Sequence, residues 1–192
     1  MIIDDKKRCD WCTSSDLYKK YHDEEWGVPV YDDATLFEFL LLETFQAGLS
    51  WITILNKREN FRKAFDQFDY QKIARYNDDK ILDLLQDAGI IRNKLKVYSV
   101  ITNAQAFIKI QEEFGSFSNY IWNFVDGKPV INNRNSLKDV PATTPFSNMI
   151  SKDLKKRGFK FLGSTVVYAY LQATGIVNDH LESCWKAPQP PK

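Results

Sequence analysis

Glycines and helix-capping residues divide most of this chain into segments whose apolar residues recur with the period of an α-helix. Asp33 precedes the first long segment, 34–47, which Gly48 ends, and Ser50 precedes the next one, 51–65. Later segments of the same kind cover about 77–87, 92–114, 116–124, 147–158 and 163–174. No run of residues alternates between polar and apolar for long enough to predict a strand. The chain is therefore predicted to be all-α, with irregular ends that need some other tether.

The composition is that of an ordinary soluble globular protein. The 192 residues are 44% hydrophobic and 27% charged, which is enough to bury a core without disulfides. We expect a single unit, 1–192, with a helical core at about 33–175 and clamped ends at about 1–30 and 176–192. No apolar run has the length of a membrane span, and the charged N-terminal segment lacks the apolar region of a secretory signal. These features predict a cytoplasmic protein, in which the three cysteines are thiols or metal ligands. The sequence leaves the oligomeric state open, and nothing in it demands more than a monomer.

The charges are distributed unevenly along the chain. Residues 1–50 carry 5 Lys and Arg against 11 Asp and Glu, whereas residues 51–192 carry 21 against 14. This difference indicates a basic face in the later part, as expected of a protein that binds nucleic acid. Charges scattered over a solvated surface would give the same totals.

A tight glycine turn separates two predicted helices at 84–94. Gly89 can adopt positive φ there and direct backbone N–H groups outward, and the following helix adds its own free N–H groups. We expect this turn to hold a phosphate of double-stranded DNA through Ala88, Gly89, Ile90, Ile91 and Arg92. A plain pair of antiparallel helices without a ligand would show the same pattern.

A second joint of this type lies between the last two predicted helices. Residues 154–165 include four basic residues and two glycines. Lys160 supplies positive charge, and Ser164 and Thr165 can cap the following helix or bind a phosphate. We expect these three residues to contact DNA, although a solvated basic loop has the same composition.

Glu43 is a carboxylate on an otherwise apolar helix face. By helical spacing it shares this face with Phe39 and Leu40, so it should point into the interior or into a cleft. A buried carboxylate needs a partner, which is either the protein's own backbone or a ligand. Aromatic residues lie close in sequence: Trp51 follows the helix, and Trp11, Tyr18, Tyr21 and Trp26 precede it. Flat rings around one carboxylate suit a flipped, positively charged base, whereas core packing would use the same rings without a ligand.

The two ends of the chain carry four potential metal ligands: Cys9, His22, His180 and Cys184. Two cysteines and two histidines make a closed tetrahedral set for zinc, which would clamp the ends together. His180 and Cys184 would face the same way if they lay one turn apart on a helix. Cys12 could replace one ligand, and isolated histidines with unrelated thiols are the alternative to any metal site.

Seven segments, in order along nearly the whole chain, resemble the bacterial DNA-3-methyladenine glycosylase I family. They are RCDW from Arg8, YHDEEWGVP from Tyr21, LETFQAGLSW from Leu42, NKRENF from Asn56, DAGIIR from Asp87, KKRGFKF from Lys155 and VNDH from Val177. The family commonly has glycine after the first cysteine, where this chain has Asp10. That departure affects the turn beside the metal ligands rather than the chemistry.

The resemblance implies a helix–hairpin–helix glycosylase fold with one structural zinc ion in an extension built from the two ends. The family's zinc ligands fall on Cys9, His22, His180 and Cys184. Its base-recognising glutamate falls on Glu43, which would be the catalytic group, and its base-binding aromatics fall on Tyr21 and Trp51, with Trp11 and Trp26 beside them.

The implied activity is hydrolysis of the bond between 3-methyladenine and deoxyribose in alkylated duplex DNA. It would leave an abasic site and free 3-methyladenine without strand cleavage. We expect Glu43 to accept a hydrogen bond from the adenine amine, and Leu49 to act as a wedge in the gap left by the flipped base. The alternative function is a zinc-stabilised DNA-binding module without catalysis, which would not explain the carboxylate among aromatic rings.

Overall fold

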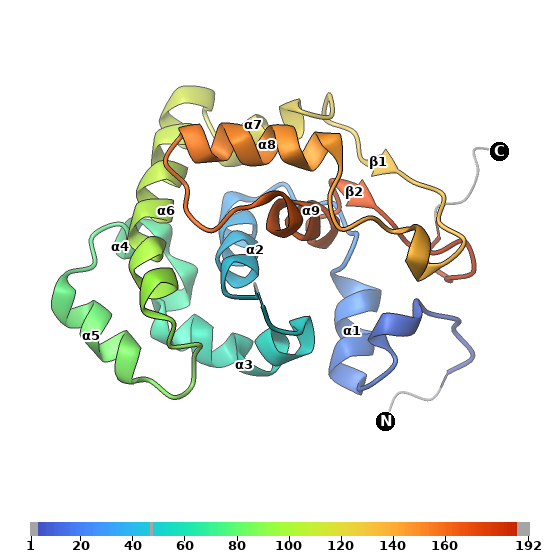
Figure 1. Ribbon diagram of the computed structural model, residues 1–192, viewed down its shortest axis with the longest axis horizontal. Helices are drawn as coiled ribbons and strands as arrows, with labels where there is room; N and C mark the ends of the chain where they lie inside the picture. The colour runs from blue at the N-terminus through green and yellow to red at the C-terminus, as the bar shows by residue number, and fades with distance from the viewer. Residues whose placement is uncertain (1–3, 47, 188–192) are drawn as a thin grey trace.

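The structure, a computed structural model, describes residues 4–46 and 48–187 and consists mainly of helices (Figure 1), which confirms the predicted helical class. The α-helices are α1 (Asp16–Glu24), α2 (Asp33–Gln46), α3 (Trp51–Ala64), α4 (Tyr70–Ile73), α5 (Asp78–Gln86), α6 (Lys94–Phe114), α7 (Phe117–Asn123), α8 (Pro145–Lys156) and α9 (Ser164–Ala173). The shorter elements are the 3-10 helices η1 (Asp10–Cys12), η2 (Asp66–Phe68) and η3 (Leu137–Asp139), and the strands β1 (Val130–Ile131) and β2 (Val177–Asn178).

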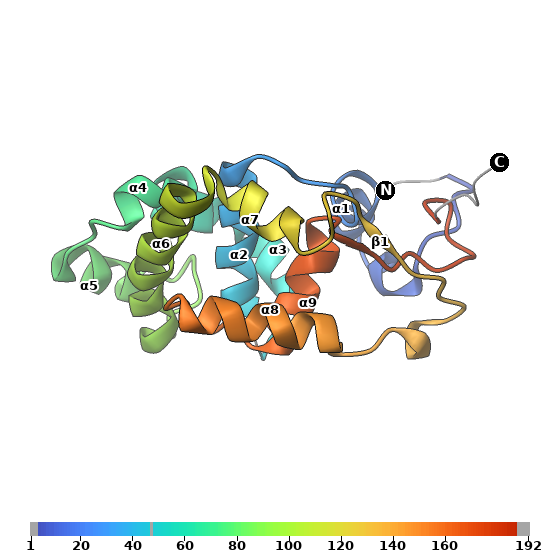
Figure 2. The ribbon, with the colours of Figure 1, turned by 90° about the horizontal axis from the view of Figure 1, so that it is seen from above.

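Helix α2 runs through the centre of the molecule and packs against α3, α6, α7 and α9 (Figures 1 and 2). Its residues from Leu36 to Phe45 are buried except for Glu38, which is partly exposed. The burial of these leucine and phenylalanine side chains supplies much of the driving force for folding. Because neighbours cover α2 on so many sides, a polar side chain on it must find a partner or line a cavity.

The N-terminal end of α2 is capped differently from our prediction. Asp32, not Asp33, accepts a hydrogen bond from the backbone N–H of Thr35, at 2.8 Å. The Asp33 carboxylate instead accepts from the backbone N–H groups of Phe117 and Ser118, at 2.9 and 2.8 Å. Asp33 therefore caps α7, a contact that local capping patterns cannot predict. The predicted last residue of this helix, Ala47, lies outside the described residues.

Most other helices lie close to their predicted ranges. Helix α8 begins earlier than predicted because Thr144 forms a capping box with Ser147 and Pro145 occupies the first helical position. The sequence analysis missed α1, which Ser15 caps by accepting from the backbone N–H of Tyr18. Ser50 precedes α3 as predicted, but its hydroxyl lies 2.8 Å from Thr53 Oγ1 and caps no backbone N–H.

Two short parallel strands, absent from the prediction, tie the irregular segment after α7 to the end of the chain. Val130 pairs with Val177 and Ile131 with Asn178. Strands this short bury too few side chains to leave an alternating pattern in the sequence. None of the described helices combines the length and the apolar character needed to cross a membrane.

Candidate functional site

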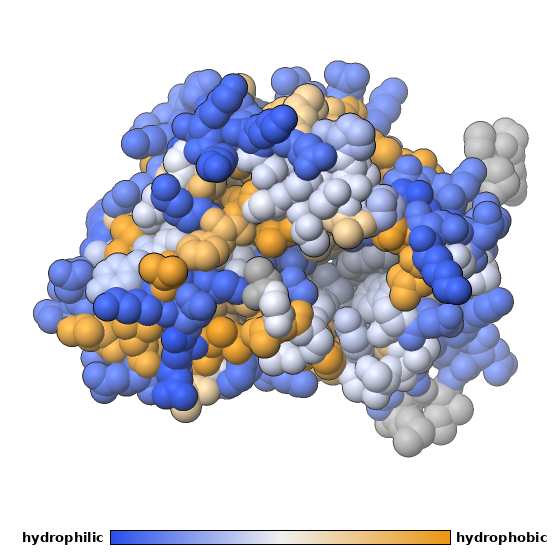
Figure 3. Space-filling view, in the orientation of Figure 1, coloured by the Kyte–Doolittle hydropathy of each residue, from blue (hydrophilic) through white to orange (hydrophobic). Residues whose placement is uncertain are grey.

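A cavity of about 210 Å³ lies between α2, α9 and the N-terminal part of the chain, where Figure 3 shows a hollow in the molecular surface. This volume is below the roughly 300–1,000 Å³ of pockets for drug-sized ligands. It therefore suits a ligand of about the size of one nucleobase.

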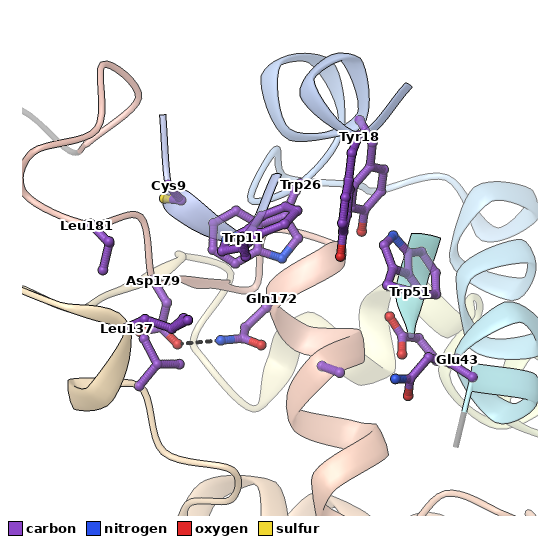
Figure 4. Close-up of a pocket in the computed structure, with 14 residues that line it drawn as sticks. Cys9, Trp11, Tyr18, Trp26, Glu43, Trp51, Leu137, Gln172, Asp179 and Leu181 are labelled. Carbon is purple, nitrogen blue, oxygen red and sulfur yellow. Dashed lines mark hydrogen bonds between the residues drawn. The ribbon is translucent and has the colours of Figure 1, made fainter. Parts of the chain in front are cut away.

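The structure brings all five predicted base-binding side chains to this cavity (Figure 4). Glu43 projects from the last turns of α2, and Trp51 is the first residue of α3. Tyr21 lies on α1, Trp11 on η1, and Trp26 in the turn that follows α1. The sharp connection between α2 and α3 is what places a carboxylate and an indole side by side.

Tyr18, which the sequence analysis grouped with the aromatic residues near Glu43, also lines the cavity. Other lining residues were not singled out from the sequence: Gln46, Leu137, Val140, Ala169 and Gln172. Helical spacing could have indicated Gln46, because it lies three residues after Glu43. Leu137 and Val140 belong to η3 and its C-cap, in a segment without periodicity, so only the fold shows that they form a wall.

The rings around the cavity contact one another at angles. The centroids of Tyr21 and Trp51 lie 5.4 Å apart with planes tilted by 47°, and Trp11 meets Trp26 edge to face at 5.0 Å. For a third ring to stack between two others, the two outer rings would have to lie about 7 Å apart, which is two stacking contacts of about 3.5 Å each. A base can therefore stack against Tyr21 or Trp51 but has no room between them.

Glu43 is only 3% exposed, and its Oε2 atom has no hydrogen-bond partner among the described residues. Burial raises the pKa of Glu43 to about 8, so a positively charged ligand would be needed to favour the ionised form near neutral pH. Glu38, on the same helix, differs: its carboxylate pairs with Arg58 and Arg62 at 2.6 and 2.7 Å. The third acid of α2, Asp33, also has hydrogen-bond partners, so the buried and unpaired Glu43 marks a binding site.

Three potential metal ligands meet beside this cavity. The ligand atoms of Cys9, His22 and Cys184 lie within 4.8 Å of one another, and all three residues are buried. They meet because the two ends of the chain pair, with the Trp185 N–H donating to the Lys7 carbonyl at 2.8 Å. The second ring nitrogen of His22, Nδ1, lies 2.8 Å from the Asp23 carboxylate, a contact typical of metal-binding histidines.

His180 lies next to these three ligands but is not within the same 4.8 Å group. Its Nε2 atom is buried and has no hydrogen-bond partner within the described ranges, while Nδ1 lies 2.9 Å from Asn178 Oδ1. Its ring centroid is 5.1 Å from that of His22. Burial lowers the pKa of His180 to about 3, so the imidazole is neutral and able to bind a metal ion.

His180 and Cys184 do not lie on a helix, so the shared helix face considered in the sequence analysis does not apply to them. The segment after β2 is irregular, and Leu181 forms a bridge with Arg134. That bridge holds the C-terminal segment against the loop after β1 and takes the place of helical hydrogen bonds. Cys12 is outside the ligand group, and its thiol donates to the Cys9 carbonyl at 3.0 Å.

The turn between α5 and α6 differs in detail from our prediction. Gly89 does not adopt positive φ. A glycine is needed there because a Cβ would lie 2.9 Å from Asp87 Oδ1 and 3.1 Å from Asn60 Cβ. Lys57 donates to the carbonyls of Ala88 and Gly89, at 3.0 and 3.2 Å, which holds this turn to α3. Five residues were predicted to contact DNA here. Ile90 is buried and Ile91 partly buried, while Ala88 and Gly89 have little or no side chain. Arg92 is the one of the five that presents an exposed polar side chain.

The joint between α8 and α9 contains the positive-φ glycine expected of such a turn. Gly158 has φ +98 and ends α8. Lys160 and Thr165 are exposed, but the Ser164 hydroxyl lies 2.7 Å from that of Ser147 and so joins the starts of α8 and α9. This joint lies on the same face of the molecule as the C-terminal end of α2 (Figures 1 and 2).

The turn between α2 and α3 presents the predicted wedge residue. Leu49 is 38% exposed, and its carbonyl accepts from the Gln46 side chain at 2.7 Å. From α6, the buried Lys96 donates to the Phe45 carbonyl at 3.1 Å. The end of α2 is thereby tied to the helix that follows the α5–α6 turn.

Comparison with known proteins gives consistent matches over nearly the whole chain. The methyladenine glycosylase family model matches residues 11–187. DNA-3-methyladenine glycosylase 1 of Escherichia coli is 46% identical over 178 residues, which cover 93% of this chain and 95% of that protein.

Solved structures agree with this match. A crystal structure of a 3-methyladenine DNA glycosylase I superposes with a TM-score of 0.92 and 48% identity, covering 95% of this chain and 100% of the other. A 3-methyladenine DNA glycosylase I from Staphylococcus aureus, solved to explain its recognition of 3-methyladenine, gives a TM-score of 0.91 and 37% identity, with 96% of this chain and 98% of that one covered.

Proposed function

This chain belongs to the methyladenine glycosylase family, and on that premise we propose that it hydrolyses the bond between 3-methyladenine and deoxyribose in alkylated duplex DNA. The observation that carries this proposal is the unpaired, buried carboxyl group of Glu43 in a cavity walled by aromatic rings. Methylation at N3 gives adenine a positive charge and weakens its bond to the sugar. A cationic ring and an exocyclic amine are what such a cavity can recognise.

Recognition and catalysis use the same contacts in this proposal. The flipped base stacks on Tyr21 or Trp51, and its positive charge favours the ionised form of Glu43. The Glu43 carboxylate then accepts a hydrogen bond from the adenine amine. A base that lacks this donor would leave the carboxylate unpaired in an apolar cavity, which strongly disfavours its binding.

The products are an abasic site and free 3-methyladenine. Among the described residues that line the cavity there is no lysine, the side chain that would attack the sugar and lead to strand cleavage. The bond is therefore broken by water, and the base leaves as a neutral molecule because its departure removes the positive charge.

The duplex is held through phosphate contacts around the cavity entrance. We assign these contacts to the α5–α6 turn, with Arg92, and to the α8–α9 joint, with Lys160 and Thr165. Such contacts position the duplex without reading its sequence. Extrusion of the base costs a few kcal/mol and is easiest where the base pair is already damaged.

We further propose that Cys9, His22, Cys184 and His180 hold one structural zinc ion. The unpaired Nε2 of His180 supports the fourth position, since a buried polar atom without a partner is otherwise costly. Four protein ligands leave no position for water, so the metal would hold the ends together rather than act in hydrolysis. Cys9 also lines the base cavity, so the clamp would fix one of its walls.

Release of 3-methyladenine from alkylated duplex DNA, followed by chromatography, tests the proposed activity. The alternative function, a non-catalytic DNA-binding module, predicts duplex binding with no free base. A cytoplasmic, monomeric protein remains the expectation from the sequence.

A further inference from the structure

Phe161 lies in the joint between α8 and α9 in an unfavourable backbone conformation. Its φ is +58, in the left-handed region that a side chain with a Cβ atom adopts at a cost. The phenyl ring is nevertheless 40% exposed. A glycine would adopt this conformation without strain. An exposed aromatic side chain kept at a strained position indicates a role outside the core.

The neighbours of Phe161 are fixed from inside the protein. The buried Asn103 side chain, on α6, accepts from the Lys160 N–H at 2.7 Å and donates to the Lys160 carbonyl at 3.1 Å. On the other side, the Ser151 hydroxyl donates to the Leu162 carbonyl at 2.7 Å, and the Leu162 side chain is buried. The backbone is thus held on both sides of Phe161, and its exposed ring lies at the surface.

The segment that carries this ring is basic. Lys155, Lys156 and Lys160 are exposed, and no acidic residue occurs between 154 and 165. Helix α9 begins three residues after Phe161 and contributes Ala169 and Gln172 to the wall of the base cavity. The ring therefore stands on a positively charged edge attached to the cavity wall, which suits a polyanion that enters the site.

We propose that Phe161 contacts the DNA duplex, packing its ring against a deoxyribose next to the phosphate held by Lys160, and that Asn103 is the residue that positions it. The inference rests on the proposed function. A phenyl ring cannot bind phosphate, but the sugars between phosphates present apolar surface. Burial of the ring on the duplex would supply the favourable free energy that the strained conformation lacks in the free protein.

Substitution of Phe161 by glycine separates this role from a structural one. In Phe161→Gly the strain is removed, so Tm should stay the same or rise. Affinity for an unmodified duplex, measured by fluorescence anisotropy at fixed salt, should fall about tenfold. Binding of free 3-methyladenine, followed by tryptophan fluorescence, should not change. Leu82→Ala, which truncates another exposed apolar side chain, is the matched control and should leave both affinities unchanged.

The role of Asn103 is tested in the same assays. Asn103→Asp keeps the acceptor and loses the donor, so it should weaken duplex binding while free-base binding stays intact. Combined with Phe161→Gly it should add little further loss, because both changes act on one contact. Duplex affinity of Phe161→Gly equal to that of the wild type would overturn the proposal. Because the duplex carries no lesion, this result is independent of whether the wild-type protein excises 3-methyladenine.

Discussion

Glu43 Oε2 and Trp51 Nε1 are both buried and lack hydrogen-bond partners in the described part of the chain, although both residues line one cavity. An acceptor and a donor left unpaired in the same apolar wall are costly to the free protein. A ligand with complementary polar groups would satisfy them. An adenine ring, which has an exocyclic amine and ring nitrogens, is a ligand of this kind.

Excision should depend on pH through Glu43. The pKa of this carboxyl group is raised to about 8 by burial, and only the ionised form suits a cationic base. We expect kcat/KM on alkylated duplex to rise from about pH 6 to about pH 8 and then level off. Steady-state kinetics over this range provide the measurement. The residual activity of Glu43→Gln should lack this rise, and a flat wild-type profile would exclude Glu43 as the titrating group.

The same group should lower stability as pH increases. A folded-state pKa of about 8, above the usual 4.5, means that the folded protein binds this proton more tightly than the unfolded chain. Stability is therefore lost as the pH rises from about 4.5 to about 8 and is constant above that. Glu43→Gln should be more stable than the wild type by a few kcal/mol at about pH 8 and equally stable near pH 4.5. Denaturant unfolding at both pH values checks this, and equal stability at the higher pH would contradict the assigned burial.

Loss of a zinc ligand should affect stability more than chemistry. Cys9→Ala or His180→Ala should lower Tm by about 5 °C or more, because the ends lose their clamp. Activity per folded molecule should fall less. Calorimetry and metal analysis of the purified variants provide the measurements. Cys12→Ala is the matched control, since Cys12 lies outside the ligand group, and it should retain one zinc ion per chain.

Leu49→Ala tests the wedge. This side chain is exposed at the turn between α2 and α3, so its truncation should leave Tm almost unchanged while it weakens excision from duplex DNA by about tenfold. Free 3-methyladenine should still bind as in the wild type. Unchanged DNA bending and excision in this variant would remove Leu49 from the flipping step.

The sequence predicted most of the helices well because these depend on local patterns, and the five residues expected to bind the base do line one cavity. Helical spacing placed Glu43 on the buried face of α2, and capping residues located most helix ends. Contacts between distant segments were less predictable. Asp33 caps a helix more than eighty residues away in sequence, and Leu137 reaches the cavity from an irregular segment.

The errors have the same physical origin. Gly89 is required by the proximity of Asn60 rather than by its own φ, and the segment of His180 and Cys184 is shaped by pairing with the loop after β1. Neither neighbour is visible from local spacing. The strained conformation of Phe161 likewise depends on the hydrogen bonds between Asn103 and Lys160, which are fifty-seven residues apart in the chain.

The central claim is that one buried carboxylate recognises an adenine flipped out of the DNA duplex. Chromatography of the bases released by the wild type and by Glu43→Gln is its most direct test. Both proteins are first shown to be folded by circular dichroism. The wild type should release 3-methyladenine from methylated duplex DNA, and the glutamine variant should do so roughly a hundredfold more slowly. A folded glutamine variant that releases the base at the wild-type rate would contradict the claim.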